Sequence, residues 1–234
     1  MAQLADSDLS WVPRWLSYPR WKPYLEAAGG NSSLGLLLYE WNLDIAQALM
    51  HDIAHIEIAL RNHYDTILSQ EIKSGDNWVF DPHTPIVAPL LRRRKGKTID
   101  LNAVNRASIA EAKRRSGLAE PTPGQVIAEL NFGFWRHMTD SSHEKSLWIP
   151  ILRKAYPPKT NRSEIDKGIR LINDVRNRAS HHEPFISPLR LEQARQAGRQ
   201  ILRLAAMIIP ELVDHIQNTS TLKTLMDEKP DSSG

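Results

Sequence analysis

The stretch that decides the fold is residues 38–67, LYEWNLDIAQALMHDIAHIEIALRNHYDTI. Its large apolar side chains recur at steps of three and four residues, which is the spacing of one face of an amphipathic α-helix. The segment Asn31-Ser32-Ser33 precedes it and offers the residue types that cap helix N-termini. We therefore predict one long helix at the centre of the molecule. The residues of its apolar face are Leu38, Trp41, Ile45, Leu49, Ile53, Ile56, Leu60, Tyr64 and Ile67.

Further helical segments are expected on both sides of this stretch. Prolines and glycines divide the rest of the chain into pieces with helical periodicity, while alternating strand patterns and Asn-Gly-type hairpin turns are not seen. Residues 74–89 are expected to form a loop. The sequence thus predicts an all-α bundle. Its other helices are expected at about residues 24–28, 101–115, 123–138, 145–156, 161–181 and 188–209, with a last, shorter one from residue 210.

The composition is that of a globular protein, with 41% apolar and 24% charged residues in a chain of 234. We expect a single domain over residues 16–228, a flexible arm at 1–15 and a disordered tail at 229–234. The chain has no cysteine, which excludes disulfides, cysteine-ligated zinc and thiol catalysis. No apolar run is long enough to span a bilayer and no signal-peptide pattern opens the chain, so we expect a cytoplasmic protein without a membrane partner.

Positive charge is concentrated in one short segment, although the net charge of the chain is only +3. Such a cluster either contacts a nucleic-acid backbone or is a solvated loop. We hypothesise that it binds RNA. The cluster comprises Arg92, Arg93, Arg94, Lys95 and Lys97.

Residues 171–185, LINDVRNRASHHEPF, carry the residues with chemical potential. Arg176 is a permanent cation, and His181 has an imidazole that titrates near neutral pH, so together they can hold a phosphate and move a proton. The alternative is structural, because cations near a helix C-terminus also satisfy its last carbonyl groups.

The helical periodicity places these two residues on different sides. At about 100° per residue, Arg176 falls within an apolar stripe, whereas Asn177 and His181 lie on roughly the opposite face. Either the helix ends or unwinds around Ala179, which the following proline, Pro184, favours, or the two groups meet across a symmetric dimer. The apolar stripe consists of Ile165, Ile169, Ile172 and Ala179.

The spacing Arg176-Asn177-x-x-x-His181 resembles the signature of the HEPN superfamily, and the chain resembles its Abi-like branch, which is named for abortive-infection phage-resistance proteins. The resemblance extends over about residues 18–228, with additional family-specific helices around a HEPN-like bundle. It rests on blocks in the same order at residues 38–42, 53–62, 128–135 and 147–148.

The resemblance implies an endoribonuclease that needs no metal or other cofactor. It implies a homodimer in which both copies of the motif line one composite active site, acting in phage defence or as a toxin with a cognate antitoxin or regulator. Arg176, Asn177 and His181 correspond to the catalytic positions, with Glu57 and His182 as supporting residues. The expected reaction is attack of a ribose 2′-hydroxyl on the adjacent phosphorus. The alternative is a non-catalytic helical module that binds RNA or another protein.

Two other constellations allow more than one interpretation. Glu57 either reaches the Arg176–His181 pair or forms an ordinary ion pair with Arg61, four residues later. His51 and His55 have the spacing of zinc ligands on a helix, but Asp52 stands where a glutamate is expected and no third ligand is evident. We therefore expect no metal site.

Overall fold

The computed structural model describes residues 9–73 and 77–231, except for the side chain of Arg94. This part of the chain is all-α apart from one small antiparallel hairpin, as predicted. The helices and strands, in order, are α1 (Val12–Leu16), α2 (Tyr18–Ala27), α3 (Ser32–Glu71), β1 (Leu91–Arg94), β2 (Lys97–Asp100), α4 (Ala103–Arg115), α5 (Pro123–Glu129), α6 (Phe132–His137), η1 (Ser141–His143), η2 (Glu144–Trp148), η3 (Leu152–Ala155), α7 (Arg162–Ser180), α8 (Pro188–Ile208), α9 (Glu211–Thr219) and α10 (Leu222–Asp227).

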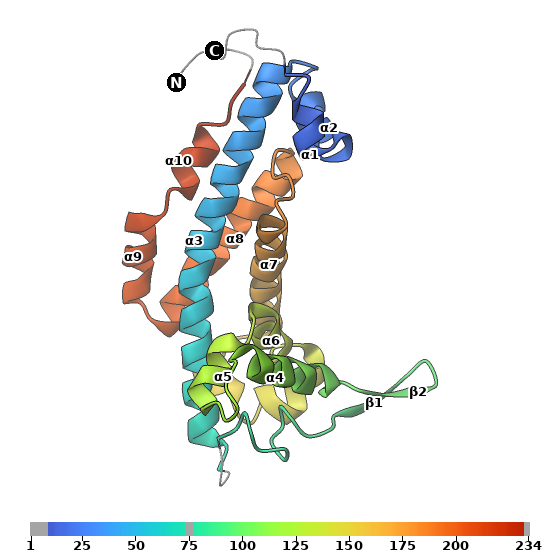
Figure 1. Cartoon of the computed structure of the whole chain (residues 1–234). Coiled ribbons are helices and arrows are strands. Elements are labelled where there is room, and N and C mark those ends of the chain that lie inside the picture. The colour runs from blue at the N-terminus through green and yellow to red at the C-terminus, as the bar shows by residue number, and fades with distance from the viewer. Residues whose placement is uncertain (1–8, 74–76, 232–234) are drawn as a thin grey trace.

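The predicted long helix is confirmed as α3, which runs the length of the molecule for 40 residues (Figure 1). The side chain of Asn31 caps it by accepting a hydrogen bond from the amide of Leu34 at 3.0 Å. Its apolar stripe packs against α7 and α8, and Ile45, Leu49 and Ile53 are fully buried. The core of the protein is therefore the three-helix layer of α3, α7 and α8.

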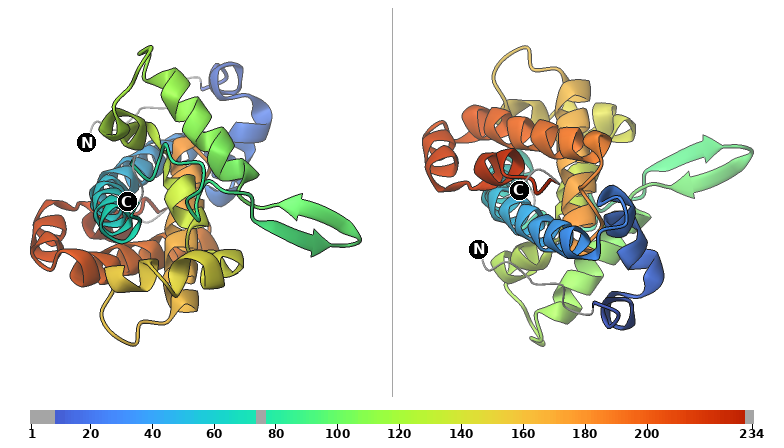
Figure 2. Two further views of the ribbon diagram at one scale, coloured as in Figure 1. Left: turned by 90° about the horizontal axis from the view of Figure 1, so that it is seen from below. Right: turned by 90° about the horizontal axis from the view of Figure 1, so that it is seen from above.

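Shorter elements cover this layer on several sides. Helices α9 and α10 lie along one side of α3, and the hairpin projects on the opposite side (Figures 1 and 2). Helices α1 and α2 close the end where α3 begins, with Val12 buried. Structure therefore begins before the expected boundary at residue 16, while residues 1–8 of the expected arm lie outside the described residues.

Two of the predicted helices are interrupted. The one expected at 123–138 divides into α5 and α6, because Leu130 and Asn131 are extended and the Asn131 side chain caps α6 at the amide of Phe134. The one expected at 145–156 is a mixture of π- and 3-10-helix. Pro150 lacks an amide hydrogen and cannot donate the backbone hydrogen bond that a regular α-helix would need at this position.

The expectation that the chain has no strands is wrong at residues 91–100, which follow the loop expected at residues 74–89. Strands β1 and β2 pair antiparallel, with Arg94 opposite Lys97, so that Lys95 and Gly96 form a two-residue turn. Both have positive φ, 49° and 78°, as the tight turns of hairpins require. Lys95 and Gly96 thus occupy the two turn positions at which Asn-Gly is common in hairpins.

The described α-helices range in length from five residues in α1 to 40 residues in α3. Within residues 9–73 and 77–231, none combines the length and the apolar character that crossing a bilayer requires.

Candidate functional site

The helix that carries the motif, α7, has one buried face and one polar face. Its predicted apolar stripe is confirmed, since Ile165, Ile169, Ile172 and Ala179 are at most 2% exposed. The opposite face carries Arg170, Asp174, Asn177 and His181 at helical spacing, and all four are exposed. The helix therefore separates Arg176 from Asn177 and His181, as the periodicity indicates.

Arg176 lies at the edge of the buried face and is half-buried. Its Nε atom is enclosed and has no hydrogen-bond partner within the described part of the chain. A guanidinium in such a place is costly unless its charge is balanced nearby. The acidic group that is electrostatically coupled to it is Glu57 on α3.

Burial raises the pKa of the Glu57 carboxyl group, and the positive charge of Arg176 is the strongest of the influences that lower it. The charge of Arg61 and the backbone amide of Phe132, where α6 begins, act in the same direction more weakly. The guanidinium of Arg61 instead donates to the carbonyl oxygen of Ala128, with an N–O distance of 3.2 Å. Of the two interpretations of Glu57, the structure favours its coupling to Arg176.

His181 stands at the C-terminal end of α7, with its side chain exposed. The helix ends at Ser180, one residue after Ala179, but the amide of His181 still donates to the carbonyl of Asn177 at 3.0 Å, so the helical path is kept as far as His181. Arg176 and His181 consequently differ by about 140° around the helix and about 7.5 Å along its axis. Within one chain the two side chains diverge.

The chain after His181 leaves the helix in a Schellman motif. His182 has a φ of 54°, its amide bonds to Ala179, and the amide of Glu183 bonds to Arg178, both at 3.0 Å. Arg178 also forms an ion pair with the Glu183 carboxylate at 2.8 Å. His182 is thus the residue that turns the backbone, and its side chain is exposed.

The segment is then fixed to α3. The amide of Phe185, which is fully buried, donates to Oδ1 of the buried Asn42 at 2.6 Å. This contact joins the chain just after the motif to the N-terminal half of α3. It holds the end of α7, and hence His181, in a defined position relative to the core.

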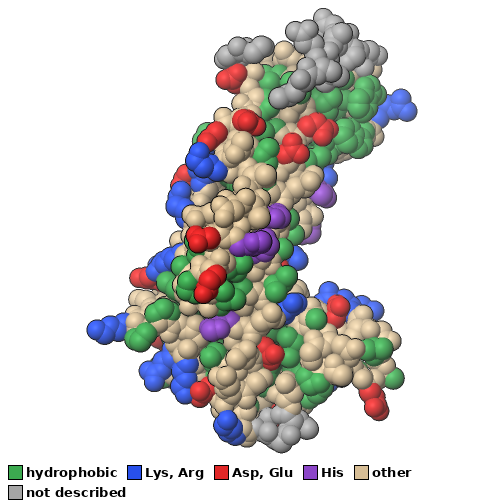
Figure 3. Space-filling view, turned by 90° about the vertical axis from the view of Figure 1, so that its left-hand side faces the viewer, with side chains coloured by type: hydrophobic (Ala, Val, Ile, Leu, Met, Phe, Trp, Pro, Cys, Tyr) green, Lys and Arg blue, Asp and Glu red, His purple; other side chains and the backbone are tan. Residues whose placement is uncertain are grey.

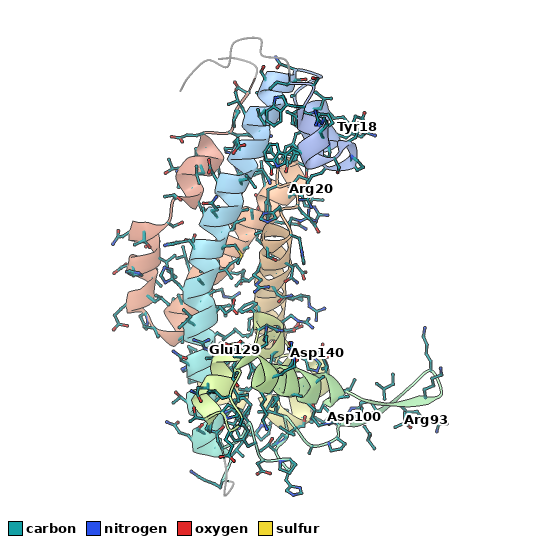
Figure 4. All side chains as sticks on the ribbon, viewed as in Figure 1. Tyr18, Arg20, Arg93, Asp100, Glu129 and Asp140 are labelled. Atoms are coloured by element: carbon teal, nitrogen blue, oxygen red, sulfur yellow. The ribbon has the colours of Figure 1, made fainter. Side chains whose placement is uncertain are left out.

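The basic cluster is carried by the hairpin, away from the motif. Arg92, Arg93, Lys95 and Lys97 are exposed, and no described acidic side chain pairs with them. Asp100 braces the base of the hairpin: it pairs with Arg106 of α4 at 2.5 Å and accepts from the amide of Leu90 at 2.9 Å. Figure 4 shows Arg93 far out on the arm and Asp100 at its base.

The histidines at 51 and 55 belong to a different cluster. Their rings make an edge contact with centroids 4.9 Å apart, and His55 makes a similar contact with His215 of α9 at 5.1 Å. Figure 3 shows the side of the molecule that is on the left in Figure 1, with histidine side chains gathered midway along it. Among the described residues, no group of three or more His, Cys, Asp or Glu side chains has the arrangement of a metal site.

Periodicity did not reveal a polar cavity beside the motif face of α7. It measures about 500 Å³ and lies between α4, α6 and α7, with Arg136, Asn173 and Asp174 in its lining. Residues Phe132, Phe134 and Trp135, which flank this arginine in sequence, are buried core residues. In the sequence, the feature that could have indicated this cavity is Arg136 itself, a cation that directly follows an apolar block.

Comparisons with known proteins add no relative: no family model, no curated protein and no solved structure matches this chain.

Proposed function

We propose that this protein is a metal-independent endoribonuclease of the HEPN type that works as a homodimer. The observation that supports the proposal is the geometry of one motif. A half-buried arginine is electrostatically coupled to Glu57, and a histidine five residues later is exposed at a helix end that the Schellman motif and Asn42 fix in place. The sequence resemblance supplies the family.

The proposed reaction uses a nucleophile that the substrate itself provides. The 2′-hydroxyl oxygen attacks the adjacent phosphorus and loses its proton, the bond from phosphorus to the 5′-oxygen breaks, and that oxygen gains a proton. The products are a 2′,3′-cyclic phosphate and a free 5′-hydroxyl end. His181 transfers the protons, and Arg176 stabilises the negative charge on the non-bridging oxygens. Asn177, one helical turn before His181, positions the imidazole or the phosphate.

A second copy of the chain completes the site in this proposal. Because Arg176 and His181 point in different directions along one α7, a phosphodiester meets both only where two copies approach each other. A two-fold axis close to the C-terminal end of α7 would bring the arginine of one copy near the histidine of its partner. The biological role in phage defence or as a toxin in the cytoplasm, with a cognate antitoxin or regulator, is proposed on the resemblance alone.

The test is RNA digestion by the purified protein in excess chelator. We expect cleavage that leaves cyclic-phosphate ends, no cleavage of an all-deoxy strand, and a loss of roughly a hundred- to ten-thousand-fold in His181→Ala. His83→Ala, which removes another exposed histidine far along the chain, should cleave like wild type. Cleavage that requires added metal, or that persists in His181→Ala, would refute the mechanism. Absence of cleavage on every RNA tested would favour the non-catalytic alternative.

Mixing two inactive variants tests the shared site. Arg176→Ala and His181→Ala proteins, unfolded together and refolded, should regain about a quarter of the wild-type rate, because half of the random dimers are mixed and each mixed dimer has one intact site of two. If each site lies within one chain, the mixture stays inactive.

A further inference from the structure

The cavity beside α7 is lined mainly by polar side chains from three helices. Ser108 comes from α4, Asn131 and Arg136 from the start and body of α6, and Arg170, Asn173 and Asp174 from α7. Its volume, about 500 Å³, is that of a small-ligand site. The lining carries two arginines and one carboxylate.

Arg136 differs from the other arginine of this cavity in having no partner among the described residues. Arg170 is engaged with Asp166 at 3.2 Å and with Asp140 at 3.9 Å. Arg136 is half-buried, yet no hydrogen bond or ion pair from residues 9–73 or 77–231 reaches its guanidinium group. A partly desolvated guanidinium with five free donors is suited to bind a phosphate.

The cavity is continuous with the face of α7 that carries the motif. Asp174 lines the cavity, Asn177 follows one turn later, and His181 one turn after that, all on one side of the helix. From Asn173 to His181 the distance along the helix axis is about 12 Å. A nucleic-acid strand that passes His181 can thus reach the cavity within a few nucleotides.

The basic hairpin lies on the other side of the same cavity. Strand β2 ends at Asp100, and α4, which forms one wall, begins three residues later. Figure 4 shows Asp140, a partner of Arg170, close to α4 on the side from which the hairpin extends. Hairpin, cavity and the His181 end of α7 therefore follow one another across the molecule.

We infer that this cavity binds one phosphate of the RNA strand, within a few nucleotides of the phosphate that is cut, with Arg136 as its principal ligand. The inference rests on the proposed function. One phosphate fits better than a polyphosphate, because the lining balances two cations against Asp174. The amide of Asn173 and the hydroxyl of Ser108 provide hydrogen-bonding groups for the adjoining ribose or base.

The test measures binding apart from cleavage. In the His181→Ala protein, we would titrate a short fluorescent single-stranded RNA of mixed sequence and compare Arg136→Gln with Arg199→Gln. Arg199 is an exposed arginine of α8 that pairs with Glu192, so it is the matched control. Arg136→Gln should weaken binding about tenfold, which corresponds to about 1.4 kcal/mol, and Arg199→Gln should not. The slope of log affinity against log salt should fall by about 0.7 for the lost phosphate contact.

Folding controls and the remaining outcomes keep the test decisive. Arg136→Lys keeps the charge and should recover part of the affinity, and all variants should melt at the wild-type temperature. Unchanged affinity and salt slope in Arg136→Gln, or a wild type that binds no RNA, would overturn the inference. RNA that is bound through Arg136 but never cleaved would refute the nuclease while supporting the cavity. If the wild type cleaves RNA but Arg136→Gln binds it as well as the parent protein does, the nuclease proposal is supported and the cavity inference is refuted.

Discussion

Glu57 on α3 and Arg176 on α7 are electrostatically coupled across the interior of the bundle. Burial raises the pKa of the Glu57 carboxyl group, and Arg176 contributes more than any other neighbour to lowering it. The coupling acts between the motif helix and the central helix. It also provides a counter-charge for a guanidinium whose Nε atom has no hydrogen-bond partner among the described residues.

This coupling predicts a specific result in double-mutant cycles. Glu57→Gln combined with Arg176→Gln should show a coupling free energy of about 0.5–3 kcal/mol in urea unfolding. The cycle of Glu57→Gln with Arg61→Gln is the control, and its coupling should be smaller because the Arg61 guanidinium bonds to Ala128. A larger coupling to Arg61 would restore the simple i,i+4 interpretation.

The second prediction concerns the backbone of His182. This residue has a φ of 54°, a region that costs a non-glycine residue about 1–2 kcal/mol. His182→Gly should therefore raise the free energy of unfolding by about 1 kcal/mol and leave RNA cleavage intact. Ser180→Gly, in the last turn of the same helix, should lower stability instead. A cleavage defect in a stabilised His182→Gly protein would show that the imidazole itself takes part.

The third prediction concerns the exposed cations of the hairpin. Replacing Arg92, Arg93, Lys95 and Lys97 by glutamine should reduce the salt slope of RNA binding by about 0.7 for each lost phosphate contact. The positions at which RNA is cut should not change, because contacts with the backbone carry no sequence information. Four exposed cations elsewhere serve as the control set: Lys22, Arg195, Arg199 and Lys223. An equal effect from that set would indicate a general charge effect.

The fourth prediction is a loss of stability in acid. Burial lowers the pKa of His143 from 6.5 to about 4, and its Nε2 atom lies 2.9 Å from Oδ1 of Asn102 in the interior. Below pH 6.5 the imidazole of His143 binds a proton in the unfolded chain, whereas in the folded protein it stays neutral until the pH approaches 4. The free energy of unfolding should therefore be highest above pH 6.5 and fall by about 3 kcal/mol as the pH approaches 4.

A substitution assigns that loss to the residue. His143→Gln should have lower stability at neutral pH and a flatter pH dependence, whereas His83→Gln, at an exposed site, should follow the wild type. An unchanged slope in His143→Gln would contradict the assignment. Burial also lowers the pKa of His137, whose ring centroid is 4.6 Å from that of His143, so part of the slope should remain.

The sequence by itself determined the elements whose cause is local. The apolar spacing predicts α3 and the buried face of α7, and Asn31 and Asn161 mark where those helices begin. The same spacing places Arg176 and His181 on different sides of α7, because residues five apart on a helix cannot face one direction.

Only the tertiary structure decided what lies opposite those faces. The partner of Arg176 is 119 positions away in the chain at Glu57, and the cavity at Arg136 is assembled from α4, α6 and α7. The sequence also did not predict the helix interruptions at Asn131 and Pro150 or the turn at Lys95-Gly96. The periodicity of one segment describes its own two faces. It carries no information about which distant side chains pack there, because those contacts depend on how the whole chain folds back on itself.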